Sequence, residues 1–225
     1  MDEKISTGEI LAAIDGGGLG DWRKVALGIA ARYRVADARA GAAFTVAVAD
    51  LAAAAGRAPE VRLGAAFVDV TLSTADPAGG GRWVTARDLE LARVISASAA
   101  ERGLTAAPGE VTQVELALDT ADDARIAPFW SALLTGDPGN VVADSILDPT
   151  GRVPAVWFQR TEPHTAPRQR WHLDLWLAPE VAQERIAAAV AAGGTVVSDA
   201  EAPSFTVLAD PDGNKACVCT ALDRR

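Results

Sequence analysis

Cysteine is scarce in this chain of 225 residues, which contains only Cys217 and Cys219. Two thiols at i and i+2 of a strand point to the same face and are poorly placed for an unstrained disulfide. We therefore predict free, buried thiols. So few cysteines are also typical of a reducing compartment, and a cytoplasmic location is expected.

Long apolar runs are absent as well. Although 49% of the residues are hydrophobic, charged residues interrupt the apolar runs before they reach the roughly 20 residues of a membrane span. The first ten residues, MDEKISTGEI, have the acids Asp2 and Glu3 near their start and no apolar stretch after them, so no signal peptide is expected. The composition predicts a chain with a sizeable core and no membrane partner.

Positive charge is in short supply. The 21 basic and 30 acidic residues give a net charge of −9 and an isoelectric point of about 4.7. Nucleic acids and anionic membranes select basic surfaces, so neither is an expected partner. Residues 1–107 have a net charge of −1 and residues 108–225 one of −8. This difference fits two modules of different origin.

The first half of the chain alternates helical and strand patterns. We predict helices over 7–14, from the Asp37 cap to 55 and from the Thr85 cap onward, with strands over 22–27, 31–35 and 61–74. The long helix has Ala42, Val46, Ala49 and Ala53 on one face. The last helix points Leu89, Ala92 and Ile95 inward.

This αββαβα order over about residues 5–103 resembles the pterin-4a-carbinolamine dehydratase family. The resemblance rests on Trp22 and on the segments FTVAVADLAAAAG, VDVTLST and TARDLELARVI. That family carries a His-His-Pro after its long helix and a further His after the Thr-Thr that ends its strand. Here these positions read Arg57-Ala58-Pro59 and Thr74-Ala75, while Asp88 matches the family's acidic position.

Without these histidines the site lacks the groups that would transfer protons in a dehydration. Dehydrating a carbinolamine requires a base and an acid, but Arg57 does not exchange protons near neutral pH and alanine has none to exchange. Arg57, Pro59 and Asp88 thus mark a degenerate site. Two alternatives stay open for this half: a structural or dimerising relic, or a pocket reused with Arg57 as an anion contact. Asp88 is also typical of an acid that favours a helix N-terminus.

The second half contains an internal repeat. Residues 113–116 (QVEL) return as 172–175 (HLDL), and residues 148–151 (DPTG) return as 210–213 (DPDG). Each copy predicts strand, helix, strand, strand, turn and strand. The helices are expected near 122–134, with Phe129 and Trp130 inward, and over 179–192. We expect a first domain over 1–104, a linker over 105–109 and a second domain over 110–225, with repeats at 110–160 and 170–222.

Paired βαβββ units resemble the glyoxalase-like branch of the vicinal-oxygen-chelate superfamily, which includes glyoxalase and bleomycin-resistance proteins. The segments APFW, RWHLDLW and LADPDGNKACV carry this resemblance over about 110 residues. It implies an α+β chain whose second domain curls a sheet around a cavity. Superfamily members isomerise, open rings or epoxides, or sequester drugs, so the resemblance implies no single reaction.

Metal-using members of that superfamily take ligands from the first and last strands of each unit. Gln113 and His172 fall on the first-strand positions, and Cys217 stands where the second unit would carry a glutamate. The strand near 157–159 offers Trp157, Phe158 and Gln159 but no carboxylate. This set lacks the anionic oxygens that Mg²⁺, Mn²⁺ or Fe²⁺ prefer, so no cofactor is expected. Zinc bound by His172 and Cys217 is the alternative.

Alternation places His172, Asp174 and Trp176 on one face of their strand. A polar pair beside a flat apolar wall suits an aromatic or conjugated ligand. His172 would then act as a base with Asp174 or Gln113 positioning the substrate, or it would only bond a neighbouring strand. His164 and Arg168 are further contact candidates at the cavity mouth. The remaining substrate-binding candidates are Glu115, Trp157, Gln159, Trp176 and Cys217.

The sequence therefore predicts a small-molecule-binding protein or a metal-independent lyase or isomerase that uses the second domain. One alternative is a sequestering protein without turnover. Another is pterin dehydratase activity in the first domain, which the missing histidines oppose. A homodimer is the expected assembly.

Overall fold

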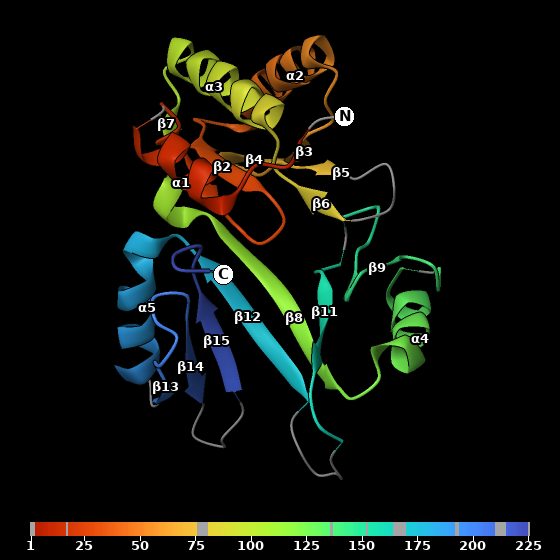
Figure 1. Ribbon diagram of the computed structural model, residues 1–225. Coiled ribbons are helices and arrows are strands. Elements are labelled where there is room, and N and C mark those ends of the chain that lie inside the picture. Colours follow the sequence, from red (N-terminus) through yellow and green to blue (C-terminus); the bar gives the residue numbers. More distant parts are fainter. Residues whose placement is uncertain are drawn as a thin grey trace. The chain divides into compact units, whose positions relative to one another are not determined.

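The computed structural model describes residues 3–16, 18–75, 81–135, 137–151, 153–163, 170–191, 194–209 and 215–224. The chain forms two compact units, the first mainly of residues 1–76 and 82–111 and the second mainly of residues 112–223. Both units combine helices and strands (Figure 1). The predicted α+β class is confirmed.

An antiparallel sheet with the order β1-β2-β4-β3 forms the centre of the first unit, and β7 pairs with β2 as well. The strands are β1 (Trp22–Lys24), β2 (Ile29–Arg34), β3 (Glu60–Leu63), β4 (Phe67–Leu72) and β7 (Thr105–Ala106). The other elements are α1 (Thr7–Gly16), α2 (Ala38–Ala55), α3 (Ala86–Glu101), the short hairpin β5 (Thr74–Ala75) and β6 (Arg82–Trp83), and the 3-10 turn η1 (Pro108–Glu110).

Alternation along β2 and β4 supplies much of the core of the first unit. Ile29, Ala31 and Tyr33 are buried from β2, and β4 buries Val68, Val70 and Leu72. The edge of the Tyr33 ring packs on Phe44 of α2, with ring centroids 5.2 Å apart. Helices α2 and α3 lie side by side (Figure 1). Leu89, Ala92 and Ile95 of α3 are buried as predicted.

Helix α2 begins where predicted but buries a different face. The Asp37 carboxylate accepts the Ala40 N–H at 2.8 Å and so caps the helix. The predicted apolar face is wrong, because Val46 is 60% exposed. The buried residues are Gly41, Phe44, Val48 and Ala52. Alanines on every side make the two faces similar, and burial of the large Phe44 ring decides between them.

By length and composition alone α2 would suit a membrane span, with a mean hydropathy of 1.3. Its Phe44 and Val48 lie in the hydrophobic core of the first unit. Only 22% of the helix is buried, and Phe44 and Val48 belong to that share.

The strand predicted over residues 61–74 is a hairpin instead. β3 and β4 pair antiparallel, and the Gly64 N–H donates to the Phe67 carbonyl at 2.8 Å to close the turn between them. A Cβ atom on Gly64 would lie only 2.4 Å from the Phe67 ring. The glycine therefore permits a turn that the continuous apolar pattern conceals.

The second unit is one eight-stranded sheet built from two βαβββ repeats, as predicted. The first repeat contains β8 (Thr112–Thr120), α4 (Asp123–Thr135), β9 (Val141–Val142), β10 (Ser145–Ile146) and β11 (Val156–Arg160). The second contains β12 (Trp171–Leu177), α5 (Pro179–Ala191), β13 (Thr195–Ser198), β14 (Phe205–Ala209) and β15 (Lys215–Cys219). Figure 1 shows α4 beside β9–β11 and α5 beside β13–β15.

The two repeats meet through their first strands. β8 and β12 pair antiparallel at the centre of the sheet, with Glu115 directly opposite Asp174. The last strand of each repeat then pairs in parallel with the first, β11 with β8 and β15 with β12. Glu115 and Asp174 therefore occupy equivalent positions in the two repeats.

Both helices of the second unit pack on the same face of the sheet. Leu118 and Phe158 belong to a core cluster with Ala127 and Trp130 of α4, and the α5 side has its own cluster around Leu177. The rings of Trp130 and Trp171 meet edge to face with centroids 4.7 Å apart. Trp130 is thus a core residue, whereas the side chain of Phe129 lies outside the described residues.

Candidate functional site

The sheet face opposite α4 and α5 gathers most of the polar candidates of the second unit. The strand register gives this face Gln113, Glu115, Ala117 and Asp119 from β8, Trp157 and Gln159 from β11, His172, Asp174 and Trp176 from β12, and Cys217 and Cys219 from β15. We call it the histidine face. The predicted site residues of the second unit thus share one surface, including the His172, Asp174 and Trp176 set.

His172 lies next to a carboxylate that the sequence interpretation overlooked. Its Nε2 atom is 2.9 Å from Oδ1 of Asp119, at the far end of β8. The His172 side chain is 30% exposed and that of Asp119 is 5% exposed. Among the described residues, Oδ1 of Asp119 has no hydrogen-bond partner although it is buried, so the ring N–H of His172 is not aligned for a hydrogen bond. The contact is an ion pair whenever His172 is protonated.

A sequence signal for Asp119 did exist. Alternation from Gln113 through Glu115 and Ala117 assigns Asp119 to the same face. A buried acid near the end of an apolar strand requires a partner, and His172 supplies one across the sheet.

Two other carboxylates hold tryptophan rings in place. The Trp157 Nε1–H donates to Oδ2 of Asp174 at 3.1 Å, and the Trp176 Nε1–H donates to Oε2 of Glu115 at 2.8 Å. Glu115 is 8% exposed and Asp174 is 6% exposed. Each repeat therefore fixes one indole through the acid at its central position.

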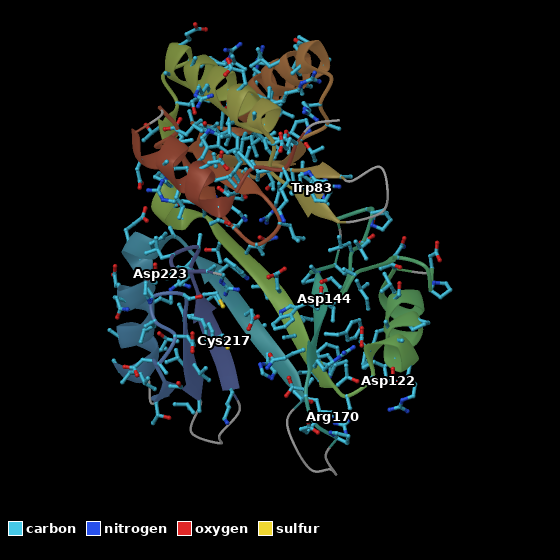
Figure 2. All side chains as sticks on the ribbon, viewed as in Figure 1. Trp83, Asp122, Asp144, Arg170, Cys217 and Asp223 are labelled. Carbon is cyan, nitrogen blue, oxygen red and sulfur yellow. The ribbon has the colours of Figure 1, made fainter. Side chains whose placement is uncertain are left out.

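The remaining candidates occupy other positions on the histidine face. Gln159 on β11 is opposite Asp119, and the buried Oε1 of Gln113 has no hydrogen-bond partner in the part of the chain that the structure describes. The two cysteines do not form a disulfide with each other; Cys219 is buried, and Cys217, labelled in Figure 2, is half-buried opposite Asp174. His164 and Arg168 lie outside the described residues.

The donor set does not fit a divalent metal. Gln113 is opposite Trp176 and His172 is opposite Ala117. Four residues of strand separate these positions, about 13 Å. Among the described residues, no group of three or more His, Cys, Asp or Glu side chains is placed to hold a metal ion.

The degenerate dehydratase residues of the first unit do come together. A pocket of about 220 Å³ is lined by Gly56, Arg57, Ala58, Pro59, Leu72, Ser73, Thr74, Ala75, Arg82 and Asp88. Gly56 ends α2 with φ of 64°, a left-handed conformation that suits glycine. The described lining contains no histidine.

Asp88 is engaged in the structure of α3. Its Oδ2 accepts the Thr74 hydroxyl at 2.7 Å and the backbone N–H and hydroxyl of Thr85, both at 2.8 Å. Together with the Thr85 hydroxyl, this forms a capping box at the helix start. Arg57 donates to the Thr74 and Thr85 hydroxyls at 3.2 and 3.4 Å. These contacts give Asp88 the capping role that its position favours.

Comparison with known proteins supports both resemblances. Residues 3–98 match the family model described as pterin 4 alpha carbinolamine dehydratase, and residues 115–219 match the glyoxalase-like domain. Among solved structures, a transcriptional coactivator/pterin dehydratase from Brucella melitensis is 27% identical, covering 42% of this chain and 97% of that chain, with a TM-score of 0.37. An NAD-dependent benzaldehyde dehydrogenase from Legionella pneumophila is 13% identical, covering 48% and 97%, with a TM-score of 0.36. A search of curated proteins found no match.

Proposed function

Because the chain joins a pterin-dehydratase-like domain to a glyoxalase-like domain, we propose that it binds a small molecule on the histidine face and transfers a proton there without a metal. The reaction class is a lyase or isomerase step. His172 is the base, and Asp119 positions it. The observation that carries this proposal is the 2.9 Å contact between His172 Nε2 and Asp119 Oδ1.

The contact suits the charge change of a general base. An imidazole that takes a proton becomes a cation, and an adjacent carboxylate stabilises that cation. The burial of Asp119 limits screening of its charge by water. His172 is 30% exposed and so stays accessible to a ligand. Asp174, predicted to position the substrate, accepts the Trp157 ring N–H.

The two tethered indoles favour a flat ligand. Trp157 and Trp176 are on the same face as His172, and each has its ring N–H bound to a carboxylate. Rings held in this way lose little conformational freedom when a ligand arrives. Trp176 is only 6% exposed and Trp157 is half-buried, so an aromatic or conjugated molecule would bury apolar area mainly against Trp157.

A sequestering protein without turnover is the second candidate. The Trp157–Asp174 and Trp176–Glu115 bonds favour it, because they support binding and do not require proton transfer. The two candidates differ in the role of His172. An enzyme requires His172 to accept a proton, whereas a sequestering protein requires only contact between the His172 side chain and the ligand.

A ligand screen with proton exchange as its second readout separates the candidates. Aromatic and pterin-like compounds would first be tested by thermal shift, because a ligand at about a hundredfold excess over its Kd stabilises by about 2.7 kcal/mol. Bound compounds would then be followed by NMR for solvent deuterium uptake. Uptake that His172→Gln abolishes supports the enzyme; binding without uptake supports sequestration. Stoichiometric Zn, Mn, Ni or Fe in active protein would contradict a metal-independent reaction.

A further inference from the structure

We propose that the pocket of the first unit is an oxyanion site, in which Arg57 and Arg82 bind the carboxylate or phosphate of a small ligand with an apolar body. This site is separate from the histidine face and independent of the function proposed there. It assigns a ligand class to a pocket whose described lining lacks the histidines of the resembled family.

Hydrogen bonds anchor both arginines beside consecutive residues of the pocket wall. Arg57 Nη1 donates to Thr74 Oγ1 at 3.2 Å, while Arg82 Nε donates to Ser73 Oγ at 2.9 Å and its Nη2 to the Ser73 carbonyl at 3.3 Å. Arg57, Arg82 and both anchoring residues line the same pocket. Two guanidinium groups from distant parts of the chain are therefore anchored on its wall.

The charge of the lining favours an anion. Among the described lining residues, Arg57 and Arg82 are cations and Asp88 is the single acid. Three donors from Thr74 and Thr85 already satisfy Oδ2 of that acid. Guanidinium groups stay charged and bind carboxylates and phosphates through paired N–H groups.

The remaining wall and the volume set the size of the ligand. Leu72, Ala58, Pro59 and Ala75 line a space of about 220 Å³. These side chains offer apolar contact but no proton donor. A single ring that carries one oxyanion matches this combination of lining and volume.

Titration of the full chain with benzoate, phenyl phosphate and the neutral benzamide tests the proposal. Isothermal titration calorimetry should show benzoate or phenyl phosphate binding at least about tenfold tighter than benzamide, with affinity falling as salt rises. If benzoate binds more tightly than phenyl phosphate, the site prefers a carboxylate; the opposite order indicates a phosphate site. Equal binding of benzamide, or no binding of either anion, would overturn the proposal.

Four variants locate the binding. Arg57→Gln and Arg82→Gln should each weaken the preferred anion by about tenfold or more, whereas Arg93→Gln, which removes an arginine of α3 outside the lining, should leave the affinity unchanged. Because Arg57 also contacts the α3 cap, Arg82→Gln provides the result if Arg57→Gln fails to fold. His172→Gln should bind the anion normally. Loss of binding in His172→Gln but not in Arg82→Gln would place the anion on the histidine face and contradict this assignment.

Discussion

Carboxylates on the histidine face have different partners according to their position along the strands. Asp119 contacts the imidazole of His172, whereas Glu115 and Asp174 accept indole N–H groups. The latter two acids also oppose each other directly across β8 and β12. We infer that Asp119 positions His172 for proton transfer. Glu115 and Asp174, the central pair, instead fix the orientation of the two tryptophan rings.

The central pair predicts opposite effects for two substitutions at one position. Asp174→Asn keeps an oxygen acceptor for Trp157 and removes a like charge opposite Glu115, so we expect a gain of about 0.2–1 kcal/mol in unfolding free energy. Asp174→Ala leaves the indole N–H without its acceptor, so we expect a loss of about 1–3 kcal/mol. Urea denaturation measures both. If Asn destabilised as much as Ala, charge repulsion would play no part.

Tyr33 predicts a pH dependence of stability. Burial is the main reason that the pKa of its hydroxyl lies well above the ordinary value, and nearby Asp21 raises that pKa further. The unfolded chain releases this proton at about pH 10 while the folded chain keeps it. The stabilising contribution is therefore complete below about pH 10 and is lost as pH rises towards the folded-state pKa.

This titration can be measured directly because the chain has a single tyrosine. Tyrosinate absorbance should stay flat past about pH 10 while the fold persists by circular dichroism, and should rise on unfolding. Tyr33→Phe should lose stability less steeply over this alkaline range. Ionisation near pH 10 in the folded protein would contradict the burial assigned to this hydroxyl.

At the scale of elements, the start of α3 links the helix to the pocket of the first unit that Arg57 and Arg82 line. Thr85 caps α3, and its hydroxyl contacts both Asp88 and Arg57. We expect Thr85→Ala to destabilise the chain by about 1–2 kcal/mol through the lost cap. Thr85→Ser keeps the hydroxyl and should lose far less. Thermal or urea unfolding of this matched pair is the measurement, and equal losses would show that the hydroxyl does not cap the helix.

The sequence predicts an element well where one local signal dominates. The caps at Asp37 and Thr85 and the alternation of His172, Asp174 and Trp176 all appear in the structure. Each depends on residues within one turn of helix or one strand. Such signals act before any tertiary contact is known.

The structure differs from the sequence-based predictions where the contact that determines a feature joins residues distant in sequence. The buried face of α2 depends on Phe44 meeting Tyr33, which no pattern within the helix contains. The β3–β4 turn depends on Gly64 approaching the Phe67 ring. The Asp119–His172 contact depends on the register between β8 and β12, which pairs residues from the two repeats. Such contacts require the pairing of strands and the packing of helices to be known.

At the scale of the whole molecule, each unit has its own hydrophobic core. The segment expected to link them, residues 105–109, provides β7 and the start of η1. The Ala107 N–H donates to the Arg32 carbonyl at 2.8 Å. Glu110 also forms ion pairs with Arg32 and Arg34. The first unit therefore extends to residue 111.

This arrangement predicts which fragment of the first unit is more stable. A fragment of residues 1–111 keeps β7 and the Glu110 contacts, whereas residues 1–104 lack both. We expect the shorter fragment to unfold several degrees lower, because a loss of about 1 kcal/mol lowers the Tm of a domain of this size by roughly 4–8 °C. Calorimetry of the two fragments measures this. Equal Tm values would show that β7 and Glu110 add nothing to the unit.

The central claim is that His172, positioned by Asp119, transfers a proton on the histidine face. Its most direct measurement is NMR of solvent deuterium uptake into the tightest ligand from the thermal-shift screen, with wild type, His172→Gln, Asp119→Asn and the control Asp123→Asn, which removes a carboxylate from α4. The account predicts that His172→Gln and Asp119→Asn each slow the uptake by about 10²-fold or more with ligand affinity retained, and that Asp123→Asn matches wild type. Unchanged uptake in His172→Gln would contradict it.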